Sequence, residues 1–77
     1  MKMDKRIKCV RKECEDIYCV DLGRGCFLTV DLKDFCYGSA EYGRDFDSEE
    51  LEKIGRLEIV TDTEELKRVS DFVAENV

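Results

Sequence analysis

The sequence contains no histidine, proline, tryptophan or glutamine. Without histidine, the chain lacks the side chain that most often serves as a general base or orients a nucleophile. No serine or threonine lies in a recognisable nucleophile elbow, and carboxylates are so abundant that no chosen pair indicates acid–base catalysis. We therefore expect a non-enzymatic protein without a cofactor.

Long apolar segments are also missing. No run reaches the roughly 18 apolar residues that a membrane-spanning helix requires. The basic first twelve residues are not followed by the apolar stretch of a signal peptide. We therefore expect a cytoplasmic protein with no membrane contact.

Five cysteines are present, at positions 9, 14, 19, 26 and 36. An odd number in a reducing compartment favours free thiols over a disulfide framework. There is no C-x-x-C pair, and the five-residue spacing of Cys9, Cys14 and Cys19 fits neither a zinc nor an iron–sulfur motif. A thiol redox or metal role for these three cysteines stays an alternative function, with Cys9 and Cys19 as a candidate cross-strand pair.

The formal net charge of −6 is unevenly distributed. Residues 1–12 carry six bases and one acid, whereas the remaining residues carry seven bases and eighteen acids. An acidic body of this kind repels nucleic acid and suits a basic protein surface or metal cations. The basic first segment could contact phosphates, but lysines on an edge strand also discourage pairing with other chains.

Residues 16–32 form the clearest element, in which two runs rich in β-branched and aromatic residues flank a Gly-Arg-Gly loop. This pattern predicts a β-hairpin, because glycine adopts the positive φ that tight loops require. If Leu22 lies opposite Cys26, alternation puts six apolar side chains on one face: Tyr18, Val20, Leu22, Cys26, Leu28 and Val30. The other face then carries Ile17, Cys19, Asp21, Phe27, Thr29 and Asp31.

Weaker signals flank this hairpin. Residues 5–12 predict a first strand, and residues 13–15 a turn. With Val10 facing inward opposite Tyr18, Cys9 would lie opposite Cys19; the opposite parity would bury Ile7 and Cys9 instead. Residues 37–46 predict a fourth strand, although a loop with a helical turn at 33–37 is the competing interpretation.

Two helices follow. Asp47 as N-cap places Glu50 at the third helical position and lets Phe46 contact Leu51, while Gly55 suits the position after the helix. Asp62 can cap a second helix that extends to about Asn76. Its apolar stripe consists of Leu66, Val69, Phe72, Val73 and Val77. Residues 57–60 fit either a short strand or a linker.

These elements predict a single α+β domain over residues 1–77, with residues 1–4 frayed. The expected architecture is an antiparallel sheet of three to four strands in the order β-β-β-β-α-α, with an extra strand near 57–60 as an option. Both helices would cover the apolar face of the sheet and leave the other face open to water.

The acidic run at 45–50 supports an alternative function as a divalent-cation protein. Asp45, Asp47, Glu49 and Glu50 could bind Ca²⁺, which takes six to eight oxygen ligands. The run begins like a calcium loop, but Glu50 stands where that loop has its glycine and Arg56 where it has its last glutamate. Helix capping accounts for Asp47, Glu49 and Glu50 without a metal.

The segment at 43–52, Gly-Arg-Asp-Phe-Asp-Ser-Glu-Glu-Leu-Glu, resembles a small anti-CRISPR family that inhibits type I-F surveillance complexes. The similarity is closest over residues 44–48 and 51–52, and a looser match covers the hairpin from Ile17. It implies a four-stranded antiparallel sheet backed by two helices, whose exposed sheet face binds the backbone subunit of the CRISPR complex and blocks target DNA. An acidic position of the family falls near Asp31, whereas two of its contact tyrosines fall at Cys9 and Val20.

Taken together, these features favour a small acidic interaction module that binds a basic protein surface. Its contact surface would be the open sheet face, where apolar side chains among carboxylates supply contact area and electrostatic steering. The predicted contact residues are Ile17, Asp21, Phe27, Thr29 and Asp31. We expect no direct contact with nucleic acid, and a monomer or a homodimer.

Overall fold

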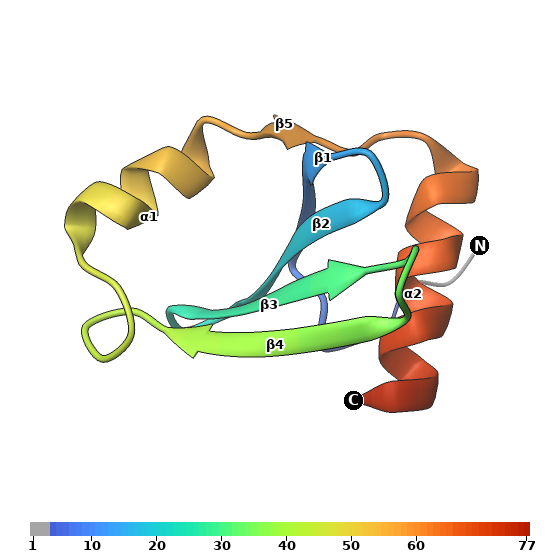
Figure 1. Ribbon diagram of the computed structural model, residues 1–77, viewed down its shortest axis with the longest axis horizontal. Helices are drawn as coiled ribbons and strands as arrows, with labels where there is room; N and C mark the ends of the chain where they lie inside the picture. The colour runs from blue at the N-terminus through green and yellow to red at the C-terminus, as the bar shows by residue number, and fades with distance from the viewer. Residues whose placement is uncertain (1–3) are drawn as a thin grey trace.

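The computed structural model describes residues 4–77 as an α+β fold, as the sequence predicts (Figure 1). The elements are β1 (Cys9–Cys14), β2 (Ile17–Gly23), β3 (Cys26–Asp31), β4 (Cys36–Glu41), α1 (Ser48–Gly55), β5 (Glu58–Ile59) and α2 (Thr63–Asn76). The five strands form an antiparallel sheet in the order β4-β3-β2-β1-β5. No helix in the part of the chain that the structure describes has the length and apolar character to cross a membrane.

β2 and β3 form the predicted central hairpin. Val20 lies opposite Leu28, as predicted, and Tyr18 lies opposite Val30. The prediction that Leu22 lies opposite Cys26 is wrong, because a bulge after Asp21 brings Gly23 to that position. Leu22 is the extra residue of that bulge, and the loop between the strands shrinks to Arg24 and Gly25, one residue fewer than expected. Gly23, Arg24 and Gly25 all have positive φ.

The flanking strands differ from the prediction at their ends. β1 covers Cys9–Cys14, so it starts and ends later than the predicted strand at 5–12. The turn lies at 15–16 instead of 13–15, and Asp16 in it has a φ of 63°. β4 extends over Cys36–Glu41 and stops before Gly43, whose φ of 83° redirects the chain. β5 pairs with β1, which resolves residues 57–60 in favour of a short strand.

The hydrophobic core lies between one face of the sheet and α2. The sheet contributes Val10, Tyr18, Val20, Leu28 and Val30, and α2 contributes Val69, Phe72 and Val73. Asp62 caps α2 as predicted, because its side chain accepts hydrogen bonds from Glu64 N at 2.9 Å and Glu65 N at 3.0 Å. The predicted apolar face of the sheet is therefore buried, and α2 covers it.

α1 does not share that face, so the prediction that both helices pack on one side is wrong. Asp47 does cap α1, accepting a hydrogen bond from Glu50 N at 3.1 Å, but no residue of α1 is buried and Gly55 is its last residue. Figure 1 shows α1 and α2 at opposite ends of the molecule. The chain leaves β4 at the end remote from α2, and an eight-residue helix, about 12 Å long, cannot return across the sheet.

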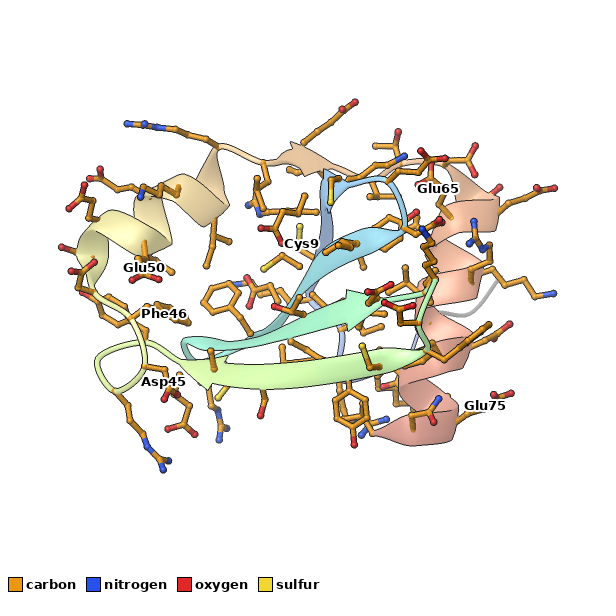
Figure 2. All side chains as sticks on the ribbon, viewed as in Figure 1. Cys9, Asp45, Phe46, Glu50, Glu65 and Glu75 are labelled. Carbon is orange, nitrogen blue, oxygen red and sulfur yellow. The ribbon has the colours of Figure 1, made fainter. Side chains whose placement is uncertain are left out.

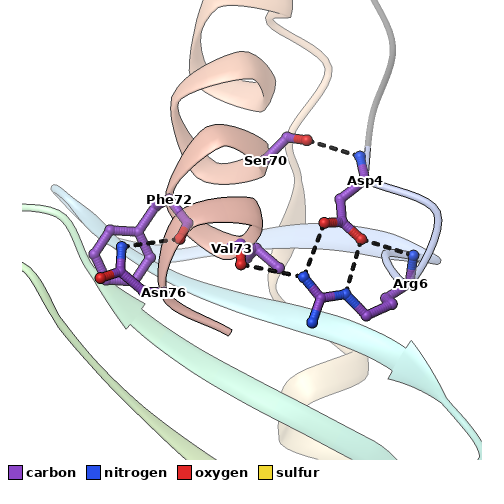
Figure 3. A network of polar contacts seen from close by, with 6 residues as sticks. All are labelled: Asp4, Arg6, Ser70, Phe72, Val73 and Asn76. Carbon is purple, nitrogen blue, oxygen red and sulfur yellow. Dashed lines mark hydrogen bonds and ion pairs between the residues drawn. The ribbon is translucent and has the colours of Figure 1, made fainter.

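The beginning of the described chain is attached to α2 by polar contacts (Figure 3). Asp4 N donates to Ser70 Oγ at 2.8 Å, and Arg6 Nη2 donates to Val73 O at 3.2 Å. Hydrogen bonds from Arg6 also lower the pKa of Asp4 to about 2. Asp4 is therefore not frayed; the rest of the segment predicted to fray, residues 1–3, lies outside the described residues.

Candidate functional site

The sheet face opposite α2, here called the outer face, carries the predicted contact residues. Alternation along the strands places on it Cys9, Arg11, Ile17, Cys19, Asp21, Phe27, Thr29, Asp31, Cys36, Gly38 and Ala40. Ile17 lies opposite Asp31, and Asp21 lies opposite Phe27, so each pair combines an apolar side chain with a carboxylate. The predicted pairing of these residues across the hairpin is confirmed.

The outer face is not fully open, which corrects the sequence-based expectation for Phe27. Its side chain is only 9% exposed, and its ring lies 5.5 Å from the ring of Phe46, centroid to centroid. Cys19, also expected on an open face, is 6% exposed. The cause is the segment from Phe46 to Leu57, which lies over part of this face.

An acidic groove remains between the sheet and this segment, with a volume of about 340 Å³. Its lining combines sheet residues with residues of the covering segment: Glu13, Cys19, Phe27, Thr29, Ala40, Asp45, Phe46, Glu50, Ile54 and Leu57. The lining therefore contains three carboxylates and no basic side chain. Figure 2 shows Glu50 and Phe46 on the side of α1 that faces the sheet.

The three groove carboxylates carry negative charge that other side chains do not neutralise. Among residues 4–77, none of the ion pairs involves Glu13, Asp45 or Glu50. Asp45 is fixed in place, because one of its oxygens accepts a hydrogen bond from Glu41 N at 2.9 Å. One base, Lys53, borders an adjoining hollow that also includes Glu13 and Glu50. The site therefore favours a cationic group with an apolar stem.

Two further carboxylates on the outer face are held by the turns next to them. Asp21 Oδ1 accepts a hydrogen bond from Gly23 N at 2.7 Å. Asp31 Oδ1 accepts from Lys33 N at 2.9 Å and from Asp34 N at 3.1 Å. These bonds give both residues a role in the hairpin loops, and they also fix the position of their charge. Thr29 is exposed, whereas Ile17 is half-buried.

Arg11 connects the covering segment to the sheet. Its Nη1 lies 3.3 Å from Gly55 O and 3.4 Å from Leu57 O, so it can donate to the backbone that follows α1. This contact draws the end of α1 towards β1. Arg11, Glu13 and Phe46 were not predicted as site residues, and Glu50 was predicted only as a calcium ligand. The apolar stripe of Phe46, Leu51 and Ile54 was the only signal of this groove, and it does not say which face of the sheet the helix covers.

The structure does not bring the carboxylates of the alternative calcium site together as a set of metal ligands. Within residues 4–77, no group of three or more carboxylates or cysteines converges as metal ligands would. Asp47 caps α1 and Asp45 accepts from Glu41 N, so both side chains have structural partners. Glu49 and Glu50 lie in the first turn of α1, where negative charge favours the helix.

The cysteines are free thiols in different environments. Cys9 lies opposite Asp21 and Arg11 lies opposite Cys19, so the predicted direct Cys9–Cys19 pairing is wrong and the two thiols are diagonal neighbours. Burial, followed by the nearby charges of Glu13 and Asp21, raises the pKa of Cys19 to about 11. Its thiol therefore stays protonated at neutral pH. Cys14 is exposed, as predicted, and so is Cys36.

Comparison of the chain with models of protein families, with curated proteins and with solved structures found no match in any of the three.

Proposed function

We propose that this protein is a non-enzymatic interaction module that binds a basic protein surface through its outer face. The acidic groove is the observation that carries the proposal. Its floor of Cys19, Phe27 and Ala40 offers apolar contact, and its carboxylates offer charge complementarity to lysine or arginine. Asp21 and Asp31 extend the negative charge along the same face.

The groove suits arginine and lysine side chains for a physical reason. Both have an apolar stem that packs on apolar surface and a charged end that stays near polar groups. A stem on Phe27 would bring the charged end within reach of the groove carboxylates. Most of the binding energy would then come from a few inserted side chains, as in protein interfaces generally.

Anisotropy measurements with a fluorescent peptide of alternating arginine and leucine test this proposal. We expect binding that weakens as NaCl is added, because surface charge attraction is screened by salt. A Glu13→Gln/Glu50→Gln double variant should bind more weakly than wild type. The matched control, Glu52→Gln/Glu75→Gln, makes the same change in net charge away from the groove and should bind like wild type.

Two results would reject the groove as the binding site. One is equal binding by both double variants, which would reduce the interaction to net charge. The other is wild-type binding to an alternating glutamate and leucine peptide that is as tight as binding to the basic one.

The anti-CRISPR resemblance gives a narrower form of the proposal, in which the basic partner is the backbone subunit of a type I-F surveillance complex. In its support, four antiparallel strands precede the first helix. Against it, the family pattern has both helices behind the sheet, whereas here α1 borders the outer face. Co-purification of this chain with a type I-F complex, compared with an Asp31→Lys variant, tests it; no recovery of wild type would exclude this partner.

A further inference from the structure

β4 forms an unprotected edge of the sheet. It is six residues long, its residues other than Ala40 are exposed, and Glu41 at its end is its only charged residue. Edge strands in soluble proteins are usually shortened, charged, bulged or covered, because their unpaired backbone groups can pair with another chain. The opposite edge follows that rule, since β5 consists of two residues, Glu58 and Ile59.

The hydrogen-bond pattern shows which groups of β4 face away from the sheet. Tyr42 N donates to Gly25 O at 2.8 Å, in line with the β3–β4 ladder. Antiparallel ladders alternate, so Cys36, Gly38 and Ala40 bond to β3 while Tyr37, Ser39 and Glu41 direct their N–H and C=O groups outwards.

The outward groups of Glu41 are already occupied. Its N–H donates to Asp45 Oδ2 at 2.9 Å, and its C=O accepts from Asp45 N at 2.8 Å and from Arg44 N at 3.2 Å. The outward groups of Tyr37 and Ser39 have no partner among residues 4–77. The open part of the edge is therefore a short, uncharged stretch centred on Gly38.

We propose that this edge pairs antiparallel with the β4 edge of a second copy of the chain, which joins two five-stranded sheets. In the two-fold register, Tyr37 lies opposite the partner's Ser39, and Ser39 opposite the partner's Tyr37. Both pairs can exchange two main-chain hydrogen bonds, so all four open groups on each copy find a partner.

The central position of this register favours a second copy as the occupant. Gly38 lies opposite the partner's Gly38 in the closely spaced, non-hydrogen-bonded type of pair, where side chains crowd most. Gly38 has no side chain to crowd this pair. A Cβ added at Gly38 would meet nothing within 4 Å, so the space above this residue on the sheet is open. No like charges oppose each other over 36–40, which is uncommon in a chain with 42% charged residues.

The rest of the molecule makes this dimer weak and sensitive to salt. Each copy carries a formal charge of −6, so the two bodies repel each other. Added NaCl screens that repulsion and should therefore strengthen dimerisation. This dependence is opposite to that expected for the basic partner of the outer face, so the two interactions can be told apart.

Sedimentation equilibrium over a wide concentration range, at low and high NaCl, tests the proposal. We expect a monomer–dimer equilibrium for wild type that shifts towards dimer at high salt. Ser39→Pro should abolish the dimer, because it removes an outward N–H without removing a bond to β3. Ser39→Ala keeps that N–H and should dimerise like wild type.

Gly38→Lys gives a second variant in case proline disturbs β4. It leaves the main-chain bonds to β3 intact and places two positive charges directly opposite each other in the dimer, so it should be monomeric. Wild type that stays monomeric at all concentrations and salts would overturn the proposal. So would a dimer that persists undiminished in folded Ser39→Pro and Gly38→Lys.

Discussion

The two faces of the sheet receive helices of different length, and they differ in burial as a result. The fourteen-residue α2 buries four of its residues on the core face, whereas the eight-residue α1 buries none on the outer face. The outer face keeps a groove of about 340 Å³ beside two buried side chains, Phe27 and Cys19. A short helix gives too little apolar area to close a face, and the space that it leaves can serve for binding.

A comparison of adjacent residues on the two faces should give the largest effect. Leu28 is 1% exposed in the core, and Leu28→Ala should lower the free energy of unfolding of the protein by about 2–5 kcal/mol. Thr29→Ala, one residue further and exposed on the outer face, should change it by about 0.5 kcal/mol or less. Urea unfolding of both variants measures the difference. Similar losses would mean that the outer face is packed as tightly as the core.

The cover of the outer face can be removed separately from the core. Phe46→Ala should cost about 1–2 kcal/mol, because the ring is half-buried, and it should expose Cys19. Native wild type should show slow reaction of Cys19 with Ellman's reagent, since its thiol is buried and its raised pKa keeps it protonated. The variant should gain one fast-reacting thiol.

Tyr37→Ala is the matched control for this experiment. It removes another partly exposed aromatic ring, which contacts Phe72 of α2 and not the outer face. Its count of fast-reacting thiols should equal that of wild type. An unchanged count in Phe46→Ala would show that Phe46 is not what shields Cys19.

Local rules predicted the elements of this fold, and they failed where long-range placement decides. Alternation fixed the Val20–Leu28 pairing, and capping chemistry located both helix starts at Asp47 and Asp62. The position of α1 depends on where β4 releases the chain, which no local pattern encodes. β5 is likewise too short to be recognised without its partner β1.

For the candidate site too, local rules predicted some residues, and long-range placement decided the others. Asp21, Asp31 and Thr29 were placed on the outer face from the hairpin register alone, and they lie there. Glu13 and Glu50 were missed as groove residues, because their proximity depends on the irregular register near the end of β1 and on the unforeseen position of α1. The unforeseen position of α1 also explains why Phe27 was wrongly assigned to the open surface.

Tyr18→Phe should have a smaller effect than Leu28→Ala or Phe46→Ala, and it tests whether α2 is also held to the core face by a polar contact. The Tyr18 hydroxyl donates to Glu65 Oε2 at 2.6 Å, so its loss should cost about 1 kcal/mol at neutral pH. Burial, followed by Glu65, raises the pKa of Tyr18 from 10.0 to about 12. The neutral phenol therefore stabilises the fold fully below pH 10, and this contribution is lost as the pH rises towards 12, where the unfolded chain has already released the proton. Urea unfolding at a series of alkaline pH values should show a steeper loss of stability for wild type than for Tyr18→Phe, so parallel curves would mean that this hydroxyl does not couple α2 to the sheet.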